Sequence, residues 1–361
     1  MEVCCFELAQ PWSVEALVAF KHCRVGPLNS LKEVNSGMKA SGEGRVDEGR
    51  VWLLPHPGLE RSPKNGENVC HWPEGDRHGR KFLQVDGCAI MQSGEQAHGD
   101  MCVWAEYEAP THARPVDAKG RGPRFVQTPL ITVGFPEMNT DPWIFHPGFV
   151  WSICKHKAEW QSPPAPGGPR QPLPGDMVLF GSPVQNSREQ WDWVLDTVVV
   201  VKRRLSGPTA GILKNSYGKL VEPALRGHTH PSPLPFVGQP HDSAAHYSFA
   251  PCKPAAAGKS AYFERPSISA LFAELRLDHS GKRPSPASAM ALSQCRPEAG
   301  MDAFWKALTQ LVWTRELALG VDFDLPAIRV LGPGTAAATP DNEVRGSEAR
   351  NAPRRKRSRA A

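Results

Sequence analysis

No stretch of the 361-residue sequence is long and apolar enough to cross a membrane, because runs such as Met177–Phe180 and Val198–Val201 are far shorter than the ~20 residues of a helical span. The N-terminus lacks the basic and then apolar segments of a secretory signal. The nine cysteines are scattered and odd in number, and none forms a Cys-x-x-Cys pair. These absences predict a cytoplasmic protein with reduced thiols, no membrane partner and no structural zinc site.

Signatures of common enzymes are also absent. The chain contains no Gly-x-Gly-x-x-Gly, Walker loop, Gly-x-Ser-x-Gly or His-Glu-x-x-His motif. A cysteine nucleophile stays open at Cys154 with His156, or at Cys252, because a thiol needs only one neighbour that stabilises its thiolate. The sequence names no cofactor and no metal site, and it leaves open whether the protein is an enzyme.

Positive charge is concentrated in one short segment. The chain has 42 Lys and Arg against 37 Asp and Glu, a net charge of +5. Residues 344–361 alone carry seven basic residues and one Glu, so the rest of the chain sums to −1. Within that tail, Arg354, Arg355, Lys356 and Arg357 are expected to contact phosphates of nucleic acid without sequence preference, or to act only as a solubilising end.

Proline and glycine are abundant, at 36 and 32 residues, and they gather in loop-like segments around 161–175, 207–258 and 332–353. The first 80 residues show little periodicity, whereas strand-like blocks begin at Lys81. The sequence therefore predicts three parts. These are a poorly patterned segment 1–80, a single domain 81–331, and a disordered basic tail 332–361.

Five segments of the predicted domain have strand-like composition. They are Phe82–Met91, Met101–Tyr107, Phe125–Val133, Met177–Phe180 and Trp193–Val201. The last two are apolar at both odd and even positions, which is typical of strands buried on both faces. A turn is expected at Gly181-Ser182, between them.

Two helices are expected near the C-terminus. The first begins at Pro266, and the second runs from an N-cap at Asp302 to about Leu319, where Gly320 stops it. The predicted fold class is α+β, with a mostly β core in a mixed or barrel-like sheet, two C-terminal helices and long loops.

Three pairs of sequence strings resemble a known family. They are Asn139–Phe145 with Ser152–Lys155, Gly175–Ser182 with Val194–Val201, and Tyr247–Cys252 with Phe263–Pro266. In these strings, which cover roughly residues 100–270, the chain resembles an uncharacterised bacterial family related to nucleotide-modification-associated domains. The resemblance implies that the protein acts on nucleic acid or nucleotides. The Pro174–Phe180 string also looks like the opening strand of PUA-, ASCH- and EVE-like small barrels, which bind RNA or modified bases.

Glu106 and Glu108 flank Tyr107 in a predicted strand, so alternation places both carboxylates on one face about 7 Å apart. Two acids at that separation can divide general acid and base roles or hold a divalent ion. The alternative is the solvent face of an edge strand.

The turn Asn139–Asp141 places three polar groups, those of Asn139, Thr140 and Asp141, beside the aromatic residues Trp143, Phe145 and Trp151. Aromatic faces next to hydrogen-bonding side chains suit a flipped or single-stranded base. A structural turn above core aromatics is the alternative, because Asp before Pro is a common turn residue.

Asp196 interrupts an apolar strand, where an unpaired carboxylate would be costly. It therefore needs a cation, several hydrogen bonds or a cavity, and Arg265 and Lys155 are candidate partners.

The leading hypothesis is a protein that acts on nucleic acid or nucleotides and recognises or modifies a base, with a lean toward an enzyme of unknown class. Its catalytic candidates are Glu106, Glu108, Asp141 and Asp196, and its substrate-binding candidates are Asn139, Thr140, Trp143, Cys154, Lys155 and Arg265. One alternative is a non-enzymatic nucleic-acid-binding module on a PUA- or ASCH-like small barrel. Another is a protein-interaction domain with no polar active site.

Overall fold

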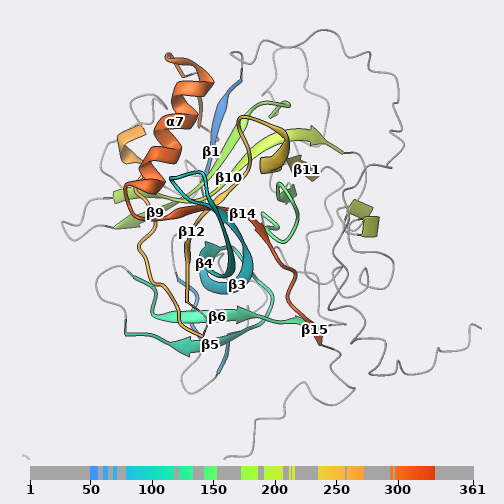
Figure 1. Ribbon diagram of the computed structural model, residues 1–361, viewed down its shortest axis with the longest axis vertical. Coiled ribbons are helices and arrows are strands. Elements are labelled where there is room, and N and C mark those ends of the chain that lie inside the picture. Colours follow the sequence, from blue (N-terminus) through green and yellow to red (C-terminus); the bar gives the residue numbers. More distant parts are fainter. Residues whose placement is uncertain are drawn as a thin grey trace, which may run out of the picture.

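Two β-sheets and the helix α7 are the main elements among the described residues of the computed structural model (Figure 1). The structure describes residues 49–55, 60–63, 68–70, 79–117, 122–132, 142–152, 172–185, 191–205, 211–212, 214–215, 235–256, 258–271, 293–295 and 297–329. The first strands are β1 (Val51–Pro55), β2 (Val69–Cys70), β3 (Lys81–Ile90), β4 (Gln96–Ala105), β5 (Thr111–Pro115), β6 (Phe125–Pro129), β7 (Ile131–Thr132) and β8 (Val150–Ser152). They are followed by β9 (Met177–Gln185), β10 (Trp191–Arg204), β11 (Pro235–Gly238), β12 (Ala250–Pro254), β13 (Ser293–Cys295), α7 (Gly300–Trp313), β14 (Ala318–Phe323) and β15 (Ile328–Arg329).

The first sheet has the strand order β13-β1-β9-β10-β11-β8. β1 runs parallel to β9, and the other neighbours are antiparallel. Alternate side chains of its central strands enter two different hydrophobic cores, so that Val178 and Phe180 belong to one and Met177 and Leu179 to the other. This confirms the prediction that β9 and β10 are buried on both faces.

The second sheet closes on itself. β3 pairs with β4, β4 with β12, β12 with β14, and β14 again with β3, all antiparallel. These four strands form a closed barrel, so each of them pairs with a neighbour on both sides. β6, β5 and β2 extend the sheet from the first half of β3, where Leu83 pairs with Gln127. The predicted mostly β, barrel-like core is confirmed in this form.

Strand β10 connects the two sheets. The Val198 N–H donates to the Phe249 carbonyl at 2.8 Å, just before barrel strand β12. The Leu195 N–H donates to the Pro266 carbonyl, also at 2.8 Å. Any polar group at this point of β10 therefore lies between the sheet and the barrel.

The prediction of two C-terminal helices is only partly correct. α7 begins at Gly300 rather than after an Asp302 cap, and it ends at Trp313. Glu316 then adopts φ 55°, a left-handed conformation that reverses the chain into strand β14. Leu319 keeps the helical spacing of the buried residues but lies in a barrel strand. In place of the other helix, the described residues show a short 3₁₀ turn at Ser269–Leu271, and the rest of that stretch lies outside them.

Two other local predictions need correction. The turn expected at Gly181-Ser182 is wrong, because β9 runs through both residues to Gln185. Strands β1 and β2 were not expected within 1–80, yet they pair with β9 and β5. The domain boundaries themselves stay a prediction. None of the helices among the described residues combines the length and apolarity that a membrane crossing requires.

Candidate functional site

Asp196 lies at a β-bulge in the middle of β10. Leu195 pairs with Gly181 and Thr197 pairs with Phe180, so Asp196 is an extra residue between two adjacent positions of β9. A bulge interrupts the alternation of side chains and redirects the extra residue. This local geometry turns a carboxylate within an apolar strand toward polar partners. Only 2% of the residue's surface is exposed.

Arg80 is the central cation around Asp196. It directly precedes β3 and is fully buried. Its Nε donates to Asp196 Oδ2 at 2.9 Å, and its Nη1 donates to Glu106 Oε2 at 2.5 Å. One guanidinium thus bridges a carboxylate of the first sheet and a carboxylate that follows barrel strand β4. Its Nη2 is buried and has no hydrogen-bond partner among the described atoms.

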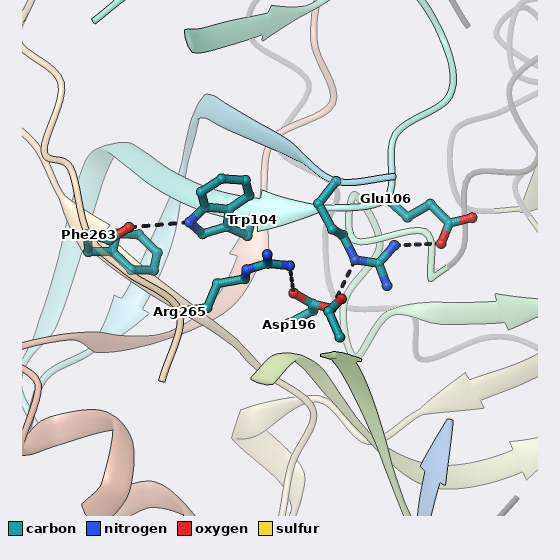
Figure 2. A network of polar contacts seen from close by, with 7 residues as sticks. Trp104, Glu106, Asp196, Phe263 and Arg265 are labelled. Carbon is teal, nitrogen blue, oxygen red and sulfur yellow. Dashed lines mark hydrogen bonds and ion pairs between the residues drawn. The ribbon is translucent and has the colours of Figure 1, made fainter. Parts of the chain in front are cut away.

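Arg265 approaches Asp196 from the opposite side. Its Nη1 donates to Asp196 Oδ1 at 2.8 Å, while the guanidinium lies 4.7 Å from the ring centroid of Trp104. Figure 2 shows the Arg265 side chain passing along Trp104 to reach Asp196. The Ser182 hydroxyl also donates to Asp196. Below, these five residues, Arg80, Glu106, Ser182, Asp196 and Arg265, are called the arginine–carboxylate network.

Two cations and two anions balance within the network. Burial would raise the pKa of Asp196, but Arg80, Arg265 and the Ser182 hydroxyl outweigh burial and hold that pKa below its usual range. Burial would likewise lower the pKa of Arg80, and the charges of Asp196 and Glu106 instead raise it. The charges of the network therefore favour the ionised forms of Asp196 and Arg80 in the folded protein.

The two predicted catalytic glutamates are both buried, so neither lies on a solvent face. Glu106 is 1% exposed and bound to Arg80, whereas Glu108 is 7% exposed and contributes its charge to the surroundings of Lys81. Because β4 ends at Ala105, strand alternation does not extend to these two residues.

The predicted aromatic pocket lies in the hydrophobic core. Trp143, Phe145 and Trp151 are each at most 2% exposed, and Trp143 packs edge-on against Phe145 with centroids 5.2 Å apart. Their faces are therefore covered by protein atoms in this structure. The indole N–H of Trp143 is buried and has no partner among the described atoms.

Of the remaining predicted site residues, Arg265 joins Glu106 and Asp196 in the network. The others lie outside the described residues: Asn139, Thr140, Asp141, Cys154, Lys155, Arg354, Arg355, Lys356 and Arg357.

Sequence reasoning missed an acidic pocket of about 260 Å³ on the barrel. It is lined by Asp86, Gly87, Cys88, His98, Gly99, Asp322 and Asp324. Burial and a hydrogen bond with Asp100 raise the pKa of Asp86, and burial and Asp324 raise that of Asp322. Asp86 comes to face Asp100 through the register of the β3–β4 hairpin, which no local sequence pattern marks. Within the described part of the chain, no three His, Cys, Asp or Glu side chains are arranged to hold a metal ion.

The contacts of the network carboxylates limit what these groups can do chemically. A general acid or base must reach its substrate with a proton to give or a free lone pair. The network carboxylates accept hydrogen bonds from arginines inside the protein, so they are suited to joining the sheet and the barrel.

Comparison with protein-family models, curated proteins and solved structures finds no match for this chain.

Proposed function

We propose that the protein is a non-enzymatic nucleic-acid-binding module, built on a small barrel, which contacts phosphates through the end of β10. The observation that carries this proposal is a run of three exposed basic residues, Lys202, Arg203 and Arg204, at the end of a strand that is otherwise largely buried. Lysine and arginine side chains that neutralise phosphates release counterions, and this release supplies most of non-specific nucleic-acid affinity.

The backbone explains why three consecutive side chains are exposed. Strict alternation in a strand with one buried face would expose only every second residue. The pairing of β10 with β11 shifts between Val201 and Arg203, which places a bulge at Lys202. The run is thus presented on a paired strand, which supports contacts of defined geometry.

The same structure makes catalysis by the predicted acids less favourable. Asp196 and Glu106 are buried and accept hydrogen bonds from Arg80 and Arg265. Using either as a general base would require breaking an ion pair away from water, which is costly. Binding is therefore favoured over base modification by these acids.

The double variant Lys202→Ala/Arg203→Ala tests the binding surface. We expect it to weaken binding of a short DNA duplex of any sequence. The negative slope of log affinity against log salt should become shallower by about 2, since each phosphate contact contributes about 0.9 to its magnitude. Fluorescence anisotropy titrations over a series of salt concentrations measure both quantities.

Two comparisons complete this test. Lys306→Ala/Arg315→Ala removes the same charge from exposed positions on or next to α7 and should leave the salt slope almost unchanged. Neutralising Arg354, Arg355, Lys356 and Arg357 in the full chain measures the contribution of the tail. If the tail variant alone removes all binding, the end of β10 is not a nucleic-acid site.

A further inference from the structure

Tyr262 is an exposed aromatic residue supported by the core. In the described part of the chain, the only large hydrophobic side chains that are exposed are Tyr262, at 39%, and Leu173, at 60%. The ring of Tyr262 lies 6.4 Å from that of buried Phe82, at an angle of 49°. Phe82 in turn contacts Trp104 and Phe263. Tyr262 thus continues an aromatic cluster from the hydrophobic core to the surface.

Polar and cationic groups surround the segment that carries Tyr262. The Ser260 hydroxyl donates to Gln84 Oε1 at 2.6 Å and accepts from Arg114 Nη2 at 3.1 Å. Arg114 and Lys259 are both exposed. The Ala261 N–H donates to Cys102 Sγ at 3.4 Å, and this contact holds the segment on barrel strand β4. An aromatic face, two cations and amide or hydroxyl groups therefore lie on one short stretch of surface.

We propose that Tyr262 is a stacking platform for an unpaired base, and that Arg114 and Lys259 contact the flanking phosphates of a single-stranded nucleic acid. This inference rests on the proposed nucleic-acid-binding function and names the form of nucleic acid that the barrel takes. Every base has a π-face, so stacking on an aromatic side chain tolerates any sequence, and nearby cations follow the backbone. In a duplex the bases are already stacked on one another, so Tyr262 gains no such contact there.

Charged groups of both signs lie around Tyr262, and Arg114 and Lys259 are the ones proposed to contact phosphates. Exposed Glu264 is two residues away, and Asp100 bonds the amide of Gln84 at 3.2 Å, so its carboxylate is engaged with the barrel surface. The basic side chains extend from two separate elements, β5 and the segment after β12. The two basic side chains can therefore contact the phosphates on either side of a stacked base.

The test uses the full chain and two probes, an oligodeoxythymidine of about 12 nucleotides, within the site size of small barrels, and a duplex of the same length. Tyr262→Ala should weaken binding of the single strand roughly 5- to 150-fold and leave duplex affinity unchanged. Tyr262→Phe keeps an aromatic face and should stay within about twofold of the original protein. A 2-aminopurine placed in the single strand should lose its fluorescence quenching in Tyr262→Ala.

Leu173→Ala is the matched control, since it also truncates an exposed apolar side chain, and it should change neither affinity. Equal single-strand affinity in Tyr262→Ala and the original protein, with duplex binding still weakened by Lys202→Ala/Arg203→Ala, overturns the stacking role alone. Absence of binding to both probes in the original protein overturns the proposed function as well. An equal loss for Tyr262→Ala and Tyr262→Phe would assign the effect to the hydroxyl and contradict stacking.

Discussion

Replacing Asp196 by alanine should lower the free energy of unfolding by about 3–5 kcal/mol, because it leaves Arg80 and Arg265 in the interior without the carboxylate that they share. Ser182 also loses its acceptor. The buried cations then carry a desolvation cost that no remaining group at this position offsets. Equilibrium denaturation by urea at neutral pH measures the change.

Asp117→Ala provides the matched control. Asp117 is an exposed acid near the end of β5, and its removal should change stability by no more than about 0.5 kcal/mol. A loss below about 1 kcal/mol for Asp196→Ala would mean that the two arginines reach water or another anion in the variant. In that case the network would not hold the sheet and the barrel together.

A double variant separates charge balance from simple loss of contacts. Arg80→Met alone takes the bridging cation away from both Glu106 and Asp196, whereas Arg80→Met/Glu106→Gln also removes one of the two negative charges. We expect the double variant to be less destabilised than the sum of the single variants, with a coupling of about 1–3 kcal/mol. Strict additivity would show that Arg80 and Glu106 do not interact.

The need of Asp196 for a cationic partner could be predicted from the sequence, but most of its actual partners could not. A carboxylate within an apolar strand needs a cation, and Arg265 is in contact with it. Arg80 belongs to a stretch without periodicity, so nothing marked it as buried. Ser182 was expected in a turn, because Gly181 suggested a chain reversal, whereas this glycine makes room for Leu53, which would lie 2.9 Å from an added Cβ.

The same contrast holds for the fold. β3 and β10 are long and rich in apolar or β-branched residues, so composition was enough to find them. β1 has only five residues, and its place between β13 and β9 depends on partners far along the chain. Closure of the barrel depends on the pairing of β14 with both β12 and β3. The partners are far apart along the chain, so the local sequence contains no pattern that predicts this pairing.

Lys81 should make stability depend on pH in a way that Lys81→Met removes. Lys81 is fully buried, and its Nζ donates to the carbonyls of Ala109 at 2.7 Å and Cys70 at 3.3 Å. Burial lowers its pKa from 10.5 to about 7. Smaller effects come from the charges of Cys70 and Glu108, which raise the pKa, and of Arg61, which lowers it further. Burial of the ammonium is therefore the dominant cause of the lowered pKa.

The sign follows from counting protons. Between pH 7 and 10.5 the unfolded chain binds a proton at Lys81 that the folded protein binds only partly, so stability rises with pH across this window. At 1.36 kcal/mol per pKa unit, the stability of the original protein relative to Lys81→Met should increase by about 3–4 kcal/mol from pH 7 to pH 10. Contributions of other groups largely cancel in the difference between the two proteins.

Urea denaturation of both proteins at several pH values gives this difference directly. Lys306→Met, which removes an exposed lysine of α7, should give a difference that is almost independent of pH. At pH 7 the Lys81→Met protein should be the more stable one by up to about 3 kcal/mol, because relief from burying the ammonium exceeds the loss of two hydrogen bonds to carbonyls of about 1 kcal/mol each or less. A pH-independent difference would instead mean that the ammonium stays protonated in the folded protein throughout the range, held by the Ala109 and Cys70 carbonyls and by Glu108.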